Sequence, residues 1–289
     1  MKISVSSYSF AQYIRAGKLT QLTAIAAAKE IGLEAIEFTD LIPPEGMTEE
    51  EYAVAIKAEA DRLGMTINAY TIGANLFQVT PEAEEAELAR LKKKVDVAVL
   101  LGAKVMRHDI CGQLSKTGAG RSFDLMLPTL AKNARIITEY AAEKGIRTCT
   151  ENHGFIAQDS VRVERLVNAV NHDNYGLLVD MGNFACADED SVMAVSRVAP
   201  YAVHAHAKDF TKRPFEMGPA EGYFQTRACN YLKGEAIGEG DIPVKQCIAI
   251  LKRAGYDGYL SIEYEGHGDC IEGIKTGFAN IKRYLEELA

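Results

Sequence analysis

The 289-residue sequence lacks three features that mark membrane, secreted or nucleic-acid-binding proteins. Its apolar stretches fall short of the roughly 18 residues that a membrane span needs, and no signal-peptide apolar core follows Met1. Its six cysteines are scattered without a Cys-x-x-Cys pair, which disfavours a disulfide framework or a zinc ribbon. It has no basic surplus, because 40 Asp and Glu against 32 Lys and Arg give a net charge of -8. We therefore expect a cytoplasmic protein that binds neither membranes nor nucleic acid.

The sequence does contain a repeated unit of a helix, a glycine and a short apolar strand. Glycine is favoured just past a helix end because it adopts the left-handed conformation without a Cβ clash. The glycines of the unit are Gly32, Gly64, Gly102, Gly145 and Gly255. Periodic apolar residues predict helices over 22–28, 52–63, 82–101, 125–144, 161–170, 191–198, 244–254 and 271–288. Strands are predicted over 3–8, 35–38, 67–71, 105–108, 148–151, 176–180, 203–208 and 259–263.

Eight strands that alternate with eight helices predict a parallel sheet, and the length suits a single (β/α)8 TIM barrel domain over residues 1–289. The main alternative is an open doubly wound sheet, which usually carries a glycine-rich phosphate fingerprint after its first strand. No such fingerprint follows residues 3–8. Long segments at 40–48, 110–121 and 209–241 follow the second, fourth and seventh strands. In a barrel these segments lie at the end where function is expected.

Polar side chains stand where four consecutive predicted strands end. They are Glu151, Asp180, His206 and Glu263. Three carboxylates would repel one another unless a cation compensated, and with one imidazole they form a ligand set that suits Mn²⁺, Mg²⁺, Co²⁺ or Zn²⁺. A single Asp or Glu at a strand end can instead cap a helix, and a single barrel His can be a core residue. Spacing leaves two choices open, because His204 and Glu265 point the same way as His206 and Glu263.

Several ordered fragments carry a resemblance to a known family. They occupy residues 32–37, 101–104, 151–153, 180–183, 206–209, 238–242 and 258–263. The chain resembles the sugar phosphate isomerase/epimerase superfamily of xylose isomerase-like TIM barrels. This group includes ketose 3-epimerases, hydroxypyruvate isomerases, inosose dehydratases and, more distantly, endonuclease IV. The resemblance implies that Glu151, Asp180, His206 and Glu263 hold one divalent metal ion, and that Glu151 and Glu263 also act as acid and base.

The resemblance also implies substrate-binding positions. Arg213 falls near a substrate-binding arginine of the family, and Asn183 stands where the epimerases carry a second histidine. Glu37 and His108, at the ends of the second and fourth strands, and His153, two residues after Glu151, are further pocket candidates. For Glu37 a purely structural hydrogen-bonding role is an equal alternative.

The expected function is therefore a metal-dependent sugar isomerase or epimerase. It would move a proton next to the carbonyl of a small polyhydroxy compound through a metal-stabilised enediolate. The alternative is a dehydratase of a keto-polyol, of the inosose or dehydroshikimate type. Cleavage of DNA at abasic sites fits poorly, because only six histidines are present and the net charge is -8. A non-catalytic sugar-binding barrel would be free to lose its ligands, yet all four are present. Barrels of this family commonly form homo-oligomers, although no interface is readable from the sequence.

Overall fold

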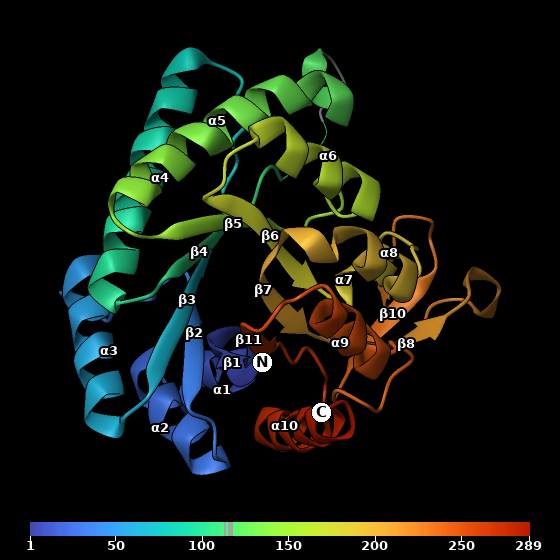
Figure 1. Cartoon of the computed structure of the whole chain (residues 1–289). Coiled ribbons are helices and arrows are strands. Elements are labelled where there is room, and N and C mark those ends of the chain that lie inside the picture. Colours follow the sequence, from blue (N-terminus) through green and yellow to red (C-terminus); the bar gives the residue numbers. More distant parts are fainter. Residues whose placement is uncertain (113, 115–117) are drawn as a thin grey trace.

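The computed structural model describes residues 1–112, 114 and 118–289 and contains a closed barrel of eight parallel strands (Figure 1). The barrel strands are β1 (Lys2–Ser6), β2 (Ala35–Thr39), β3 (Thr66–Ile72), β4 (Val105–His108), β5 (Arg147–Glu151), β6 (Tyr175–Asp180), β7 (Ala202–Ala207) and β11 (Tyr259–Ile262). They pair in the order β1, β11, β7, β6, β5, β4, β3 and β2, and β1 pairs with β2 to close the ring. The predicted (β/α)8 fold is confirmed.

Helices form the outer layer around this barrel (Figure 1). They are α2 (Gln21–Ile31), α3 (Glu49–Leu63), α4 (Pro81–Leu101), α5 (Phe123–Glu143), α6 (Ser160–Val170), α8 (Ser191–Val198), α9 (Val244–Arg253) and α10 (Cys270–Glu287). All five glycines of the repeated unit have φ between 64° and 102°, as predicted for residues that end helices. The predicted helices and strands agree with the structure to within three residues at each end.

Two regions differ from the sequence-based prediction. The first strand ends at Ser6 instead of reaching Tyr8, because residues Ser7–Phe10 turn into a 3-10 helix followed by the short helix α1 (Ala11–Arg15). The Ser9 hydroxyl fixes this turn by donating to the Ile262 carbonyl at 2.9 Å. A second short helix, α7 (Asn183–Cys186), directly follows β6. The predicted long segment 110–121 is described except for residues 113 and 115–117.

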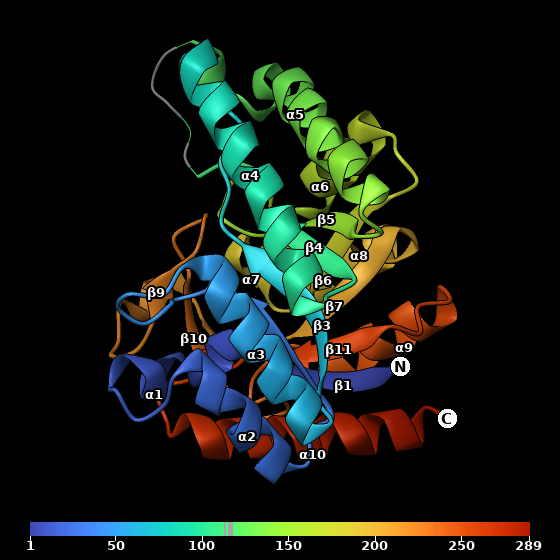
Figure 2. The same ribbon diagram turned by 90° about the vertical axis from the view of Figure 1, so that its left-hand side faces the viewer.

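The segment 209–241, predicted as a loop, contains a separate antiparallel sheet. Its strands are β8 (Asp209–Arg213), β9 (Phe224–Gln225) and β10 (Tyr231–Glu235), and Figure 2 shows β9 and β10 at the same end of the barrel as α1. The Asp209 carboxylate fixes the chain that leaves this sheet. It accepts backbone N–H groups from Gly238, Gly240 and Ile242 at 2.8–3.1 Å, and a Cβ on Gly240 would lie 2.3 Å from its Oδ1. Only glycine therefore fits at position 240.

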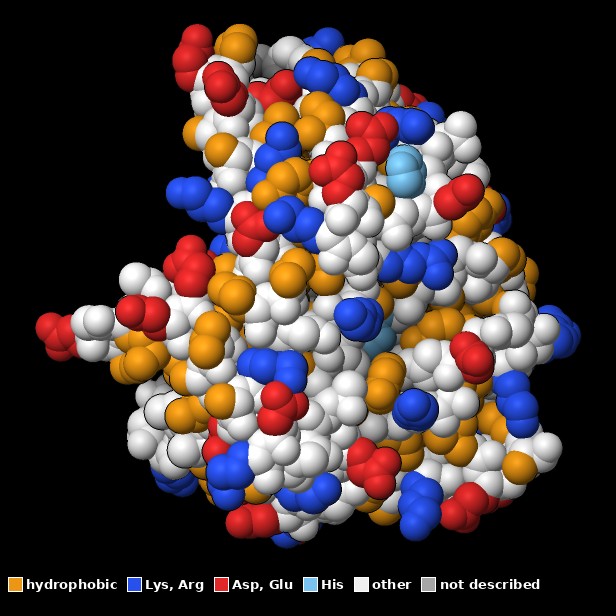
Figure 3. Space-filling view, turned by 60° about the vertical axis from the view of Figure 1, so that its left-hand side comes forward, with side chains coloured by type: hydrophobic (Ala, Val, Ile, Leu, Met, Phe, Trp, Pro, Cys, Tyr) orange, Lys and Arg blue, Asp and Glu red, His pale blue; other side chains and the backbone are white. Residues whose placement is uncertain are grey.

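Three structural features can be compared with the composition: the hydropathy of the helices, the pairing of the cysteines and the distribution of charged side chains. No helix among the described residues is long and apolar enough to cross a membrane. None of the six cysteines is paired, and only Cys229 is exposed. Acidic and basic side chains alternate over the face shown in Figure 3 rather than gathering into one basic area.

Candidate metal centre and cavity

The four predicted ligands meet at the carboxyl ends of β5, β6, β7 and β11. Glu151, Asp180, His206 and Glu263 are all buried, and one ligand atom of each lies within 4.8 Å of all the others. His206 Nδ1 lies 3.5 Å from Glu263 Oε1, 3.6 Å from Glu151 Oε1 and 3.8 Å from Asp180 Oδ2. It has no hydrogen-bond partner within the described part of the chain. A nitrogen lone pair aimed at three carboxylates is a donor set that a divalent cation fits.

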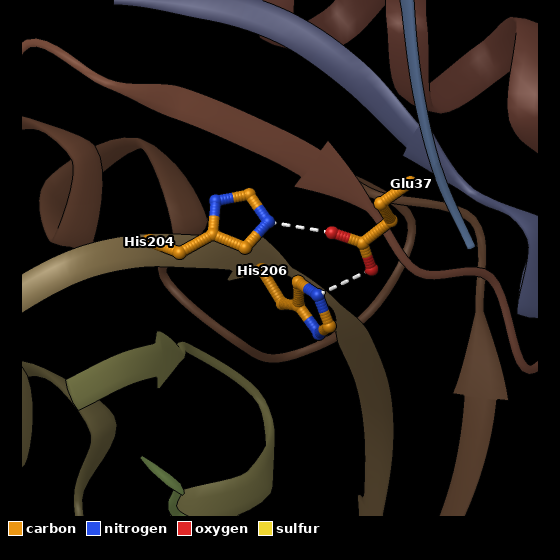
Figure 4. A group of neighbouring side chains, drawn as sticks. All are labelled: Glu37, His204 and His206. Atoms are coloured by element: carbon orange, nitrogen blue, oxygen red, sulfur yellow. Dashed lines mark hydrogen bonds and ion pairs between the residues drawn. The ribbon is translucent and has the colours of Figure 1, made fainter. Parts of the chain in front are cut away.

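Glu37 contacts both barrel histidines (Figure 4). Its Oε1 lies 2.7 Å from His206 Nε2 and its Oε2 lies 2.5 Å from His204 Nε2. A carboxylate accepts, so each Nε2 carries the hydrogen, and His206 is left with a lone pair on Nδ1. Burial raises the pKa of Glu37, but its interactions with His206 and His204 outweigh this effect and hold that pKa below its ordinary range.

This geometry separates the two histidines that spacing could not distinguish. His206 faces the carboxylates, whereas His204 turns its Nε2 to Glu37. Glu37, His204 and His206 could themselves be considered as metal ligands. Their contacts of 2.5 and 2.7 Å have hydrogen-bond length, which leaves no room for an ion between them. Glu37 is fully buried, so it is a hydrogen-bonding partner below the site and does not line the pocket, as the sequence had left open.

The two carboxylate oxygens of Asp180 make different contacts. Oδ1 accepts the backbone N–H groups of Gly182 and Asn183, both at 2.8 Å, at the start of α7. Oδ2 faces His206, so one oxygen holds the turn into α7 while the other points toward the candidate ligands. Asn183 is buried and donates from Nδ2 to Glu151 Oε1 at 3.1 Å, while its Oδ1 accepts from Lys208 Nζ at 3.2 Å. Asn183 therefore orients a candidate ligand and does not line the cavity above it.

Two buried cations, which the sequence analysis did not single out, balance part of the acidic cluster. Arg107 Nη2 lies 2.8 Å from Glu151 Oε2, and Lys208 Nζ lies 2.5 Å from Glu263 Oε2 and 3.3 Å from Asp180 Oδ2. Burial lowers the pKa of Lys208, but the charges of Asp180 and Glu263 outweigh it and hold that pKa well above its ordinary value. A charged residue within a buried strand, as for Arg107, or directly after one, as for Lys208, was the available signal.

A cavity of about 190 Å³ opens directly above the cluster. Its lining includes Glu151 and Glu263 together with Arg107, Lys208 and His153. His153 Nδ1 lies 3.1 Å from Asp109 Oδ1, and its side chain is 49% exposed. Glu265 lines the rim and is 27% exposed, which distinguishes it from the buried Glu263. Of the predicted substrate-binding residues, His153 is the one that lines this cavity.

Two other predicted pocket residues lie elsewhere. His108 is fully buried, with Nδ1 2.9 Å from the Asp109 carbonyl oxygen, and it does not line the cavity. Arg213 donates to the carbonyl oxygens of Met217 and Gly218 at 2.7 and 2.8 Å. It lines a separate 370 Å³ pocket beside Asp188, because the β8–β10 sheet carries it away from the barrel mouth. The expectation that Arg213 lies at the same pocket as the ligands is therefore corrected.

Comparisons with known proteins agree with this fold. The chain is 25% identical over 198 residues to inosose dehydratase from Clostridium perfringens, a match that covers 65% of this chain and 66% of the relative, just under two thirds of its length. Among solved structures, the IOLI protein with a binding zinc atom superposes with a TM-score of 0.76 at 16% identity and covers 100% of this chain and 99% of its own.

A second solved structure, L-ribulose 3-epimerase, gives a TM-score of 0.74 at 16% identity and covers 99% of this chain and 95% of its own. At that identity these two structures show the fold alone. The profile of the family described as "Xylose isomerase-like TIM barrel" matches residues 25–288. This chain therefore belongs to the xylose isomerase-like TIM barrel family.

Proposed function

We propose that the protein is a divalent-metal-dependent dehydratase of a small polyhydroxy ketone. The observation that carries the proposal is the unpartnered His206 Nδ1, which faces three buried carboxylates at the floor of a polar cavity. Glu151, Asp180, His206 and Glu263 would hold the metal. A divalent cation supplies Lewis acidity there, which stabilises the negative charge that develops beside a ketone when a neighbouring C–H is deprotonated.

His153 is the base that we assign to this deprotonation. It lines the cavity, and the Asp109 carboxylate 3.1 Å from Nδ1 fixes its ring and leaves the other ring nitrogen to accept a proton. The resemblance had given acid and base roles to Glu151 and Glu263. Each of these carboxylates is paired with a cation, Arg107 at 2.8 Å or Lys208 at 2.5 Å, and such a pairing weakens a base. We therefore assign both glutamates to metal ligation.

Lys208 is the proton donor that we assign to the leaving hydroxyl. Loss of water from the carbon next to the carbanion forms the double bond, and the departing oxygen takes a proton. The Lys208 ammonium lines the cavity, and the Asn183 amide oxygen 3.2 Å away helps hold it there. The positive charge of a metal held by Asp180 and Glu263 would lower the high pKa that these carboxylates give Lys208. A base two residues after β5 and an acid just after β7 therefore approach the same cavity from the ends of two separate strands.

The match to an inosose dehydratase supports dehydration, and it suggests keto-inositols as the first substrates to test. An isomerase or epimerase is the second candidate. Glu151 and Glu263 approach His206 Nδ1 from two different strands, at 3.6 and 3.5 Å, and epimerisation needs acid and base groups on opposite faces of one carbon. Both reactions begin with the same deprotonation.

The test is incubation in D₂O with Mn²⁺, Mg²⁺, Co²⁺ or Zn²⁺ and a panel of keto-inositols, ketohexoses and hydroxypyruvate. Mass spectrometry distinguishes a dehydrated product from an isomer of unchanged mass, and NMR follows deuterium entering the substrate or product. We expect loss of water from a keto-inositol. An isomeric product would favour the second candidate, and no deuterium uptake or dehydration with any compound would refute both.

Variants separate the assigned roles. His153→Asn should reduce turnover by about 10²- to 10⁴-fold while the metal content stays that of wild type. Glu151→Gln should reduce metal content and turnover together. Glu34→Gln, a change of an exposed glutamate just before β2, is the control and should alter neither. If His153→Asn kept full activity, the base would have to be reassigned.

A further inference from the structure

A second cavity, of about 650 Å³, adjoins the one above the metal ligands. Tyr8 and Glu265 line both cavities, so the two cavities share part of their walls. We call the second cavity the side chamber. Its walls come from α1, from the β9–β10 region and from the segment after β11, residues 264–270. Figure 2 shows α1 and β9 at the same end of the barrel.

The walls of the side chamber are joined by direct contacts. An isolated parallel bridge links Gly234 of β10 to Gly266, and the Gly222 carbonyl oxygen lies 3.0 Å from His267 Nε2. A Cβ on Gly234 would lie 2.4 Å from the Glu265 carbonyl oxygen, so glycine is required for this approach. Gln12 ties α1 to the same segment, because its Oε1 accepts the Cys270 N–H at 3.0 Å. The chamber is therefore a built part of the fold.

The lining combines aromatic faces with polar groups. Phe224 is 39% exposed, packs edge-on against Phe210, and faces the chamber together with Tyr8 and Tyr264. Arg15 supplies hydrogen-bond donors on the α1 side. The Glu265 carboxylate in the shared wall disfavours an anionic ligand. Aromatic faces with a few polar groups suit an uncharged, hydroxylated ring, which has apolar C–H faces and polar edges.

The sizes of the two cavities differ in a way that bears on the substrate. Pockets for drug-sized ligands span about 300–1,000 Å³. The cavity at the ligands, about 190 Å³, lies below that range and the side chamber, about 650 Å³, lies within it. We infer that the substrate is a polyhydroxy ketone that carries a second hydroxylated ring, and that the side chamber binds this second ring. The inference rests on the proposed function for the identity of the first ring.

The test compares ligands with one and two rings in the metal-loaded protein by calorimetry. The matched pairs are D-fructose with isomaltulose, its glucosyl derivative, and 2-keto-myo-inositol with a glucosyl ether of it. We expect at least one two-ring compound to bind tenfold or more tightly than its one-ring partner. Ala11→Leu, which puts bulk into the side chamber, should reduce that ratio at least tenfold. Ala16→Leu, at the exposed end of α1 outside the chamber, should preserve the ratio.

The outcomes separate this inference from the proposed function. Equal binding of one-ring and two-ring compounds in wild type, or an equal loss for both in Ala11→Leu, would overturn the side-chamber assignment even if keto-inositols are dehydrated. Tighter two-ring binding that Ala11→Leu abolishes would support the side chamber even if no deuterium exchange occurs, and in that case the proposed chemistry alone would fail. Circular dichroism of both leucine variants would confirm that each is folded.

Discussion

Replacement of Glu37 by glutamine tests whether a residue that cannot touch substrate controls the metal site. The wild-type carboxylate accepts from His204 Nε2 at 2.5 Å and from His206 Nε2 at 2.7 Å. Glutamine keeps the shape but offers one oxygen and one NH₂ group. One histidine must then accept at Nε2 and carry its proton on Nδ1 instead. When that histidine is His206, a hydrogen replaces the lone pair that faces the three carboxylates.

The expected loss is in metal affinity. Groups that orient a metal-ligating histidine typically contribute about 10- to 100-fold in affinity, which is about 1.4–2.8 kcal/mol. Both contacts here are short and fully buried, so water cannot take over the role of the lost acceptor. We expect Glu37→Gln to weaken Mn²⁺ and Zn²⁺ binding within this range while all four ligands remain.

The assay is calorimetric titration of metal-free protein, with thermal unfolding followed by circular dichroism. Glu34→Gln removes a carboxylate of the same type from an exposed position just before β2 and is the matched control. Nitrogen-15 chemical shifts of the imidazoles would report the tautomer of His206 directly. A Glu37→Gln protein that is folded and binds metal within twofold of wild type would refute the role assigned to Glu37.

Three further predictions concern the candidate ligands, the segment after β10 and the segment 226–230. Glu263→Gln should abolish stoichiometric metal binding, whereas Glu265→Gln should retain it, because Glu263 is buried with the other candidate ligands and Glu265 lies on the rim. Elemental analysis measures the metal content, and equal losses in the two variants would contradict this prediction. Asp209→Asn should lower the free energy of unfolding in urea by about 2–4 kcal/mol, since roughly half of its charge-assisted bonds to four backbone N–H groups are lost. An unchanged urea midpoint would show that Asp209 does not stabilise the fold through these bonds. Asp188→Ala should speed hydrogen exchange of amides 226–230, because Asp188 accepts from Thr226, Ala228 and Asn230 at 2.6–2.9 Å. Unchanged exchange rates would show that Asp188 does not hold this segment in place.

The fold was predictable because its signals are local. A glycine with positive φ after a helix, such as Gly32 or Gly145, depends only on neighbouring residues, and the apolar strands are continuous in sequence. The β8–β10 sheet was missed for the opposite reason. Its strands are short and mix buried with partly or fully exposed residues, so they lack the apolar run that marks a barrel strand. What fixes the chain after this sheet is Asp209, whose partners lie about 30 positions further along the chain.

The candidate ligands were predictable as a set, but their surroundings were not. Strand ends meet at one rim of a parallel barrel, so Glu151 and Asp180 had to approach each other once the fold was known. Side-chain pairings depend on distances between strands far apart in sequence. Glu37 and His206 are separated by 169 positions, and spacing alone could not show that Glu37 points below the site. The position of Arg213 could not be predicted for the same reason, because Arg213 lies on the β8–β10 sheet, which the sequence did not reveal.

The balance of buried charge argues that a divalent ion completes the site. Glu37, Glu151, Asp180 and Glu263 are buried carboxylates that meet around His206, and two buried cations, Arg107 and Lys208, lie against them. With neutral histidines this group carries an excess of two negative charges, a costly state at low dielectric. Asp209, also buried, is satisfied separately by backbone amides. One divalent cation held by the candidate ligands would neutralise the excess without a proton on His206 Nδ1. Because Arg107 and Lys208 offset two of the four buried carboxylates, the negative charge that remains is that which one divalent ion balances.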